Sequence, residues 1–280
     1  MRPLRLTILL LLCVPLLRGA AAQVPFGIAY CDVDRFCDTV ASPFRNDLDY
    51  TPEGRLAWTA ERYCRKVAQT AAVVDSLALP VVILFGVENE AVVRDVARCC
   101  ARDYAYLHRT LNRRDGRDFA LLYFGDRFFP HHVEPGGDYL YVEGTLADRA
   151  DSPCDTLGLL LCSDGRTARM LPRLLRRERP GAKLLLLGRF DPAEALRAGL
   201  REATDRAERA GRGNRFRRNR WEMADRIAVD TALRVEACEP YIRPWLLDPQ
   251  RGTPLPTYAG GSYRGGYSGA LPIFLYIAPR

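Results

Sequence analysis

The sequence predicts a mixed α/β (α+β) domain in which helices flank mixed β-sheets. Short apolar runs such as Val81–Phe85 and Lys183–Leu187 are typical of buried strands. Segments with apolar residues at helical spacing separate some of these runs, whereas other runs follow one another directly. Strands that alternate with helices and also occur in adjacent runs favour mixed sheets with helices outside.

The helices are predicted from their starting residues and apolar faces. Thr59 and Asn89 can each cap a helix, and Asp191–Pro192 is a cap followed by a first-turn proline. We expect the third of these helices to run to Gly211. The apolar positions are Tyr63, Val67, Ala71, Val74 and Leu77 in the first helix, and Val92, Val93, Val96 and Cys100 in the second. A further basic helix is predicted over Thr167–Arg179.

The remaining strands are predicted from apolar runs between turn residues. They are Phe26–Cys31, Phe119–Phe124, Tyr139–Val142, Leu157–Leu161, Arg226–Val229 and Leu271–Ile277. Arg212–Arg220 is interpreted as a basic link. His131 and His132 follow Pro130 and are interpreted as a surface turn. No repeat or domain boundary is evident, so we predict a single domain over residues 23–280.

The N-terminus predicts export. Arg2 and Arg5 precede the apolar run Leu6–Leu17, and small residues follow up to Ala22. This pattern is typical of a signal peptide over residues 1–22, and it predicts a periplasmic or extracellular protein. No segment is long and apolar enough to be a stable membrane span. Removal of the three arginines of this segment lowers the formal charge from +7 to +4. For a chain that is only mildly basic, we interpret the many arginines as a result of genome composition rather than as a nucleic-acid-binding surface.

The cysteines leave their pairing open. Without Cys13 the chain keeps eight cysteines, an even number, and export permits disulfides. Cys31 and Cys162 lie in predicted strands and fit equally as small buried residues. The spacings are not those of paired zinc knuckles.

The loop Thr257–Pro272 has the composition of a functional loop. It is rich in Gly and Tyr and leads into the last predicted strand. Such loops often display working groups on a rigid scaffold. Its tip, Ser268–Ala270, nevertheless carries no acid, base or metal ligand. We interpret Tyr258, Tyr263 and Tyr267 as packing residues.

Several segments carry a family likeness: Ala29–Thr39, Tyr50–Trp58 with Glu61–Tyr63, Leu84–Asn89, Asp118–Tyr123, Trp221–Ile227 and the Gly/Tyr loop Thr257–Pro272. Together they resemble the endonuclease/exonuclease/phosphatase superfamily, which has the deoxyribonuclease-I-like fold, and in particular its exported bacterial branch. The resemblance implies a four-layer sandwich of two mixed β-sheets flanked by helices. It also implies metal-assisted hydrolysis of phosphoesters, in which carboxylates hold the cation and a His–Asp pair acts with water.

At the family's catalytic positions this chain carries other residues. Gly86 stands where the family has its metal-binding Glu, and Ser163 where it has a phosphate-binding His. Arg189 replaces the Asp of the Gly-Asp-Phe-Asn loop, in which Asp191 takes the Asn position. The terminal Asp-His pair is replaced by Gly269 and Ala270. No catalytic site is therefore expected to be intact, and no metal cofactor is expected.

The function predicted from these losses is non-catalytic binding or a structural role. A residual cleft is expected to contain Asp32, Glu88, Asn89, Asp118, Arg189 and Asp225. Arg189 would make it cationic and suited to an anionic ligand such as phosphate or nucleic acid. Simpler roles are a helix cap for Asn89, and orientation of Arg189 or of backbone amides for Asp118 and Asp225.

Two alternatives remain at this stage. One is an active phosphoesterase or nuclease that uses Mg²⁺ or Ca²⁺ at a rearranged site of Asp32, Glu88 and Asp118. The other is a protein–protein interaction through the helical outer face, for which the sequence indicates neither a surface nor a partner.

Overall fold

The computed structural model of the protein describes residues 25–111, 113, 115–147 and 156–278. The predicted signal peptide, Cys13 and Cys154 lie outside these residues. The helices are α1 Ala60–Leu77, α2 Glu90–Cys99, α3 Thr167–Glu178, α4 Pro192–Arg197 and α5 Asp205–Arg209, with 3-10 turns η1 Leu48–Tyr50 and η2 Pro244–Leu246. The strands are β1 Phe26–Phe36, β2 Val81–Val87, β3 Ala105–Arg109, β4 Asp118–Tyr123, β5 Phe128–Pro135, β6 Tyr139–Leu146, β7 Thr156–Cys162, β8 Ala182–Gly188, β9 Leu200–Glu202, β10 Arg215–Arg217, β11 Arg220–Glu222, β12 Arg226–Asp230, β13 Arg234–Pro240, β14 Tyr258–Ala259, β15 Ser262–Tyr263 and β16 Ile273–Ala278.

The larger strands form two six-stranded mixed sheets. One sheet has the order β13-β16-β1-β2-β4-β3 and the other β5-β6-β7-β8-β12-β9. Each contains one parallel pair, β1 with β2 and β7 with β8, and its other pairs are antiparallel. The short strands make two separate ribbons, β10–β11 and β14–β15.

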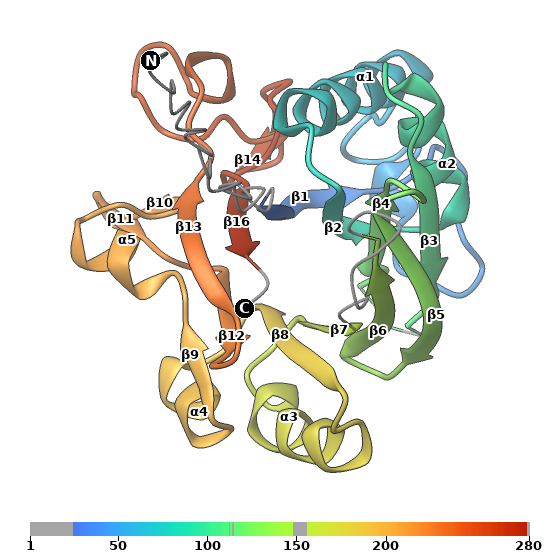
Figure 1. The fold of residues 1–280 in the computed structure, drawn as a ribbon. Coiled ribbons are helices and arrows are strands. Elements are labelled where there is room, and N and C mark those ends of the chain that lie inside the picture. The colour runs from blue at the N-terminus through green and yellow to red at the C-terminus, as the bar shows by residue number, and fades with distance from the viewer. Residues whose placement is uncertain (1–24, 112, 114, 148–155, 279–280) are drawn as a thin grey trace, which may run out of the picture.

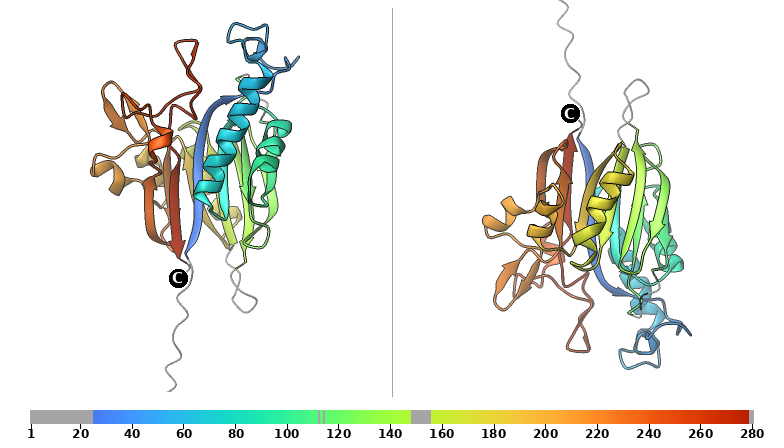
Figure 2. Two further views of the ribbon diagram at one scale, coloured as in Figure 1. Left: turned by 90° about the horizontal axis from the view of Figure 1, so that it is seen from above. Right: turned by 90° about the horizontal axis from the view of Figure 1, so that it is seen from below.

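The two sheets pack face to face, with helices outside both. Leu and Ile side chains of β2, β7 and β8 belong to one buried core between the sheets. A second core joins the outer face of the first sheet to α1 and α2, and a third joins the outer face of the other sheet to α3 and α4. The helices consequently lie on opposite sides of the molecule in Figure 1, and Figure 2 shows α1 over one sheet and α3 over the other. The predicted mixed fold with four layers is confirmed.

The predicted helix starts are confirmed by their hydrogen bonds. The side chain of Thr59 accepts from the Arg62 amide, and that of Asn89 accepts from the Val92 amide. Asp191 accepts from Ala193 at the start of α4. Each cap satisfies a backbone N–H that has no partner within its own helix.

Three local predictions are wrong. The helix predicted from Asp191 to Gly211 is two short helices, because the chain reverses at Gly199 (φ +74°) and enters β9. The predicted link 212–220 contains β10 and most of the β10–β11 ribbon. His131 and His132 lie within β5, where sheet pairing outweighs the turn signal of Pro130.

The described cysteines are all free thiols, so disulfides play no part in this portion of the structure. They are Cys31, Cys37, Cys64, Cys99, Cys100, Cys162 and Cys238. Within the described ranges, no helix has the length and apolar character needed to cross a bilayer.

Candidate functional site

An arginine lies between two buried acids at the end of the sandwich where β1 and β8 finish. Nη2 of Arg189, just after β8, lies 2.6 Å from Oδ2 of Asp32, and its Nε lies 3.2 Å from Oδ1 of Asp225. The side chains of both acids are nearly inaccessible, at 2% and 0%, whereas Arg189 retains 33% exposure. The guanidinium thus joins the two sheets through two charge-assisted hydrogen bonds.

Further polar contacts complete this network. Nη2 of Arg215, on β10, lies 2.8 Å from the same Asp32 oxygen. The Asn214 amide donates to Oδ2 of Asp225 at 2.7 Å, and its oxygen accepts from the amides of Ala224 and Asp225. The two arginines therefore face two acids, and Arg189 does not provide the unopposed positive charge that the sequence suggested.

Burial and neighbouring charges together set the pKa values of this network. Loss of water around Asp32, together with the nearby Asp225, raises the pKa of Asp32 to about 6, although Arg215 and Arg189 oppose the shift. Burial alone would lower the pKa of Arg189, but Asp225 and Asp32 raise it above its ordinary value. The guanidinium is consequently charged throughout the physiological range.

The Gly/Tyr loop is fixed to β1 by Asp34. The carboxylate of Asp34 accepts from the Gly269 amide at 3.0 Å and from the Thr257 amide at 3.3 Å. The Ser268 hydroxyl donates to the carbonyl of Asp32 at 2.5 Å. The tip of the loop is therefore a packed and hydrogen-bonded structure, although it lacks reactive side chains.

A buried lysine of α1 donates hydrogen bonds to the same loop. Nζ of Lys66, on α1, donates to the Thr257 hydroxyl at 2.8 Å and also to the Tyr267 carbonyl. Burial lowers the pKa of Lys66 to about 8, against the raising effect of Asp34 and Asp32. Tyr258, Tyr263 and Tyr267 pack against the outer core of the first sheet, as predicted.

Gly86 has a steric role that the sequence does not reveal. Its φ is +107°, and a Cβ at this position would lie 2.0 Å from the carbonyl oxygen of Asp34. Gly188 repeats the arrangement at the end of β8, with a φ of +118° and the Cys162 carbonyl oxygen at 2.0 Å from a Cβ. Since only glycine fits such a close approach, the backbone itself prevents a metal-binding Glu at residue 86.

Ser163 belongs to an adjoining arginine cluster. Its hydroxyl accepts from Nη1 of Arg113 at 2.5 Å, and the same nitrogen lies 2.7 Å from Oδ1 of Asp138. Asp115 pairs with both Arg113 and Arg117, at 3.0 and 2.9 Å. The positive charges of both arginines are therefore paired with nearby carboxylates.

Phe85 connects this cluster to Arg189. The guanidinium carbons of Arg117 and Arg189 lie 5.1 and 5.9 Å from the centre of its ring. Sequence comparison overlooked the roles of Arg113, Arg117 and Arg215. The basic stretches that contain them were the available signal. Asp115 is only two residues from Arg113 and from Arg117, whereas the Asp32 partner of Arg215 is 183 residues away in sequence.

Glu88 and Asn89 lie in a separate set of contacts. Asp38 links the two residues, because its amide donates to Glu88 and its carboxylate accepts from Asn89. The side-chain amide oxygen of Asn89 accepts a hydrogen bond from the Val92 amide as the cap of α2. Burial of Glu88 and its contact with the Asp47 carboxyl raise the pKa of Glu88 to about 8, against the hydrogen bond from the Asp38 amide.

Asp118 is likewise committed elsewhere. Its side chain is fully buried and accepts from Arg45 at 2.8 Å and from the Leu111 amide at 3.1 Å. Nε2 of His108 lies 3.3 Å from Oδ2 of Asp118. Asp118 therefore orients a backbone amide, as expected, but its arginine partner is Arg45 rather than Arg189. Asp191 is occupied as the cap of α4.

Glu88 is expected to make the protein less stable as pH rises. Its pKa exceeds the value of about 4.5 for an unperturbed Glu, so deprotonation favours the unfolded chain between the two values. Asp32 contributes in the same direction up to about pH 6. The free energy of unfolding should fall between pH 6 and 8, and Glu88→Gln should remove that fall.

Urea denaturation across this pH range measures the effect. Glu61→Gln, which replaces an exposed carboxylate of α1, is the matched control and should keep the wild-type slope. A Glu88→Gln protein whose stability falls as steeply as the wild type between pH 6 and 8 would contradict this assignment.

The donors at this end of the sandwich do not suit a divalent cation. Oδ2 of Asp32 faces two guanidinium groups, Oδ1 of Asp225 faces Arg189, and Gly86 has no side chain. In the part of the chain that the structure describes, no three His, Cys, Asp or Glu residues gather closely enough to hold a metal ion. The rearranged site of Asp32, Glu88 and Asp118 is not assembled, because these acids bind different partners.

Comparison with known proteins finds a matching family model and similar solved structures. Residues 27–140 match the model of a family described as the Endonuclease/Exonuclease/phosphatase family. No curated protein sequence matches the chain. Three similar solved structures cover nearly all of it, and at their low sequence identity they establish the fold alone.

The first is an endonuclease/exonuclease/phosphatase from Bacteroides vulgatus, with 12% identity over 92% of this chain and 100% of that chain and a TM-score of 0.60. The second is D. rerio TDP2 complexed with single strand DNA product, with 12% identity, 91% and 99% coverage and a TM-score of 0.56. The third is a mannosyl-6-phosphatase from Bacteroides thetaiotaomicron VPI-5482, with 12% identity, 90% and 99% coverage and a TM-score of 0.56.

Proposed function

Because residues 27–140 match the model of the Endonuclease/Exonuclease/phosphatase family, we propose that the chain is a member of this family that lacks metal-dependent hydrolysis and acts by binding. The observation that carries this proposal is the position of Arg189 between Asp32 and Asp225. An internal guanidinium there neutralises acids that would otherwise attract a cation. Residues 1–22 have the pattern of a signal peptide, so we propose that the protein acts in the periplasm or outside the cell.

The ligand proposed for this protein is an anion that contains phosphate. One similar structure holds a single-strand DNA product and another is named a mannosyl-6-phosphatase, so proteins of this fold accommodate chemically diverse phosphate esters. Arg217 and Arg218 are exposed, and the planar guanidinium group of arginine suits phosphate. Guanidinium groups would bind the phosphate without a metal ion and without hydrolysis.

A turnover assay tests the loss of hydrolysis. Purified protein lacking residues 1–22 should release no phosphate or nucleotide from DNA, a sugar phosphate or a simple aryl phosphodiester in Mg²⁺, Mn²⁺ or Ca²⁺. The Bacteroides thetaiotaomicron mannosyl-6-phosphatase serves as the positive control for the sugar phosphate. Turnover by the wild type that rises in proportion to protein and stops with a chelator would refute the proposal.

Restoring the terminal pair should not restore activity. In the double variant Gly269→Asp with Ala270→His, the Cβ of the new Asp would lie 3.3 Å from Oδ1 of Asp34. The new carboxylate would therefore lie close to the carboxylate of Asp34. The new imidazole would replace Ala270, which is only 3% exposed. Gly86, Ser163 and Arg189 would also remain unchanged. Metal-dependent turnover by this double variant would show that the site needs far less than we infer.

A further inference from the structure

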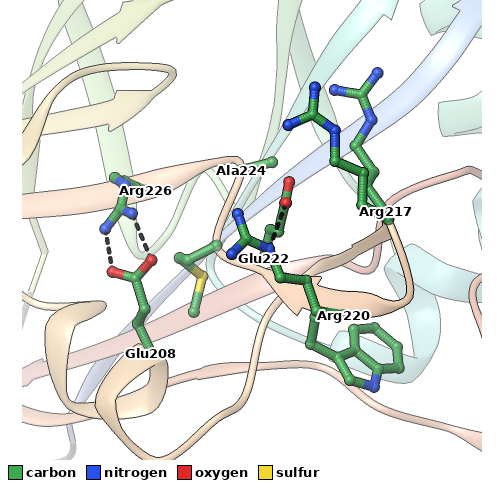
Figure 3. Close-up of a pocket in the computed structure, with 9 residues that line it drawn as sticks. Glu208, Arg217, Arg220, Glu222, Ala224 and Arg226 are labelled. Atoms are coloured by element: carbon green, nitrogen blue, oxygen red, sulfur yellow. Dashed lines mark hydrogen bonds and ion pairs between the residues drawn. The ribbon is translucent and has the colours of Figure 1, made fainter.

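A pocket of about 930 Å³ lies beside the β10–β11 ribbon. Its walls come from α5, from the ribbon and from the start of β12. They consist of Glu208, Arg217, Arg218, Arg220, Trp221, Glu222, Met223, Ala224 and Arg226. Figure 3 shows Arg217 and Arg220 at the ribbon and the Arg226–Glu208 pair at the other end. This volume is large enough for a small organic ligand.

The pocket carries positive charge that no nearby acid balances. Arg226 pairs with Glu208 at 2.7 Å, and Arg220 pairs with Glu222 at 3.0 Å. Among the described residues, Arg217 and Arg218 have no carboxylate within ion-pair distance, and both are exposed. Four arginines against two glutamates leave a formal charge of +2 in the lining, and Glu202, which also pairs with Arg226 from outside the lining, reduces this to +1. This pocket, unlike the network around Arg189, therefore offers free guanidinium groups to an anion.

The turn that presents these arginines is strained. Arg218 and Asn219 link β10 to β11 and have φ values of +47° and +62°. Two successive positive φ values define a two-residue hairpin turn that strongly favours Asn and Gly. An arginine in the left-handed region is strained, because its Cβ comes too close to the neighbouring backbone carbonyl. Glycine at residue 218 would remove this strain, so Arg218→Gly can remove the guanidinium without disturbing the turn.

The other lining groups indicate what accompanies the anionic group. Trp221 is half-buried, and its ring packs edge-on against Phe216 with 5.6 Å between ring centres. An indole in a pocket wall can pack against a flat base or the C–H face of a sugar. The carboxylates of Glu208 and Glu222 have lone pairs beyond those used by their arginines, and these can accept hydrogen bonds from hydroxyl groups.

From these observations we infer that the pocket binds an organic phosphate that carries a hydroxylated ring. The phosphate is bound by Arg217 and Arg218, while the ring lies near Trp221 and its hydroxyl groups donate to Glu208 or Glu222. Sugar phosphates and nucleotides share this chemistry. The inference rests on the proposed function, since it assigns a place to the phosphate-containing ligand of a binding protein.

Calorimetric titration with mannose 6-phosphate, AMP and inorganic phosphate tests the inference and separates the two ligand sources. At least one organic phosphate should bind the protein lacking residues 1–22 more tightly than inorganic phosphate does. Arg217→Ser with Arg218→Gly should weaken that binding roughly tenfold or more, because it removes charge-assisted hydrogen bonds. The variant should fold normally, since glycine suits the turn, and its circular dichroism and Tm check this point.

The matched control removes two exposed arginines elsewhere. Arg98→Ser with Arg177→Ser changes the net charge equally on α2 and α3 and should bind as the wild type does. The inference fails if no organic phosphate binds, if inorganic phosphate binds equally well, or if both double variants weaken binding to the same extent. Phosphate release measured in the same samples distinguishes the two proposals. Release would refute the proposal that the protein does not hydrolyse phosphate esters, whereas the affinity of the Arg217→Ser, Arg218→Gly variant tests whether the ligand binds in this pocket.

Discussion

Arg189→Ala is expected to lower the free energy of unfolding by about 3 kcal/mol. The change leaves Asp225 with only its Asn214 contact and Asp32 with only Arg215 as a counter-charge. Breaking a buried ion pair leaves an uncompensated charge, which typically costs about 3–5 kcal/mol. The lower end applies because Arg189 is 33% exposed and water partly replaces its effect. Guanidinium denaturation measures the change.

A surface ion pair provides the comparison. Arg209, on α5, has a side chain that is 80% exposed and pairs with Asp205 at 2.9 Å. Arg209→Ala should cost less than about 1 kcal/mol. Adding Asp225→Asn to Arg189→Ala should recover part of the loss, because it removes the charge left unpaired. Equal stability of Arg189→Ala and Arg209→Ala would show that Arg189 does not hold the two acids as described.

Gly86→Ala is expected to destabilise the fold by at least about 3 kcal/mol or to prevent folding. The new Cβ would lie 2.0 Å from the Asp34 carbonyl oxygen, and the φ of +107° disfavours any side chain. β1 and β2 would have to separate locally, at the point where Asp34 also holds Gly269. Thermal and chemical denaturation of the purified variant measure the loss.

Gly125→Ala is the matched control for this substitution. A Cβ at Gly125 meets no atom within 4 Å, and its φ lies outside the strained positive range. We expect a change of less than about 0.5 kcal/mol there, as for most surface substitutions. Similar stabilities of the two variants would mean that Gly86 is merely a lost metal ligand and that the backbone could accept one again.

The sequence predicted those parts of the fold that depend on local signals. Thr59, Asn89 and Asp191 mark helix starts because a cap is a contact between near neighbours. The helix predicted up to Gly211 failed because pairing of β9 with β12 overrides the local pattern. β5 was missed because its pairing with β6 supplies the stability that Pro130 and the two histidines do not suggest.

The interactions of the candidate site could not be predicted from the sequence. The resemblance named Gly86, Ser163, Arg189 and Ala270 as positions of lost catalytic residues, and that assignment stays a prediction. The partners of Arg189 are 157 and 36 residues away in sequence, so the balance of charge could not be deduced from composition. The close approach of Gly86 to Asp34 likewise depends on sheet geometry that sequence alone does not define.

A titration with Mn²⁺, followed by the electron paramagnetic resonance signal of the free ion, tests the central claim most directly. Arg189 and Arg215 occupy the oxygens of Asp32 and Asp225 with which a divalent cation would have to bond. The wild-type protein should therefore leave the free Mn²⁺ signal unchanged at stoichiometric concentration. Binding of one Mn²⁺ per chain that is lost in Asp32→Asn would contradict the account, because it would show that the acids still hold a metal.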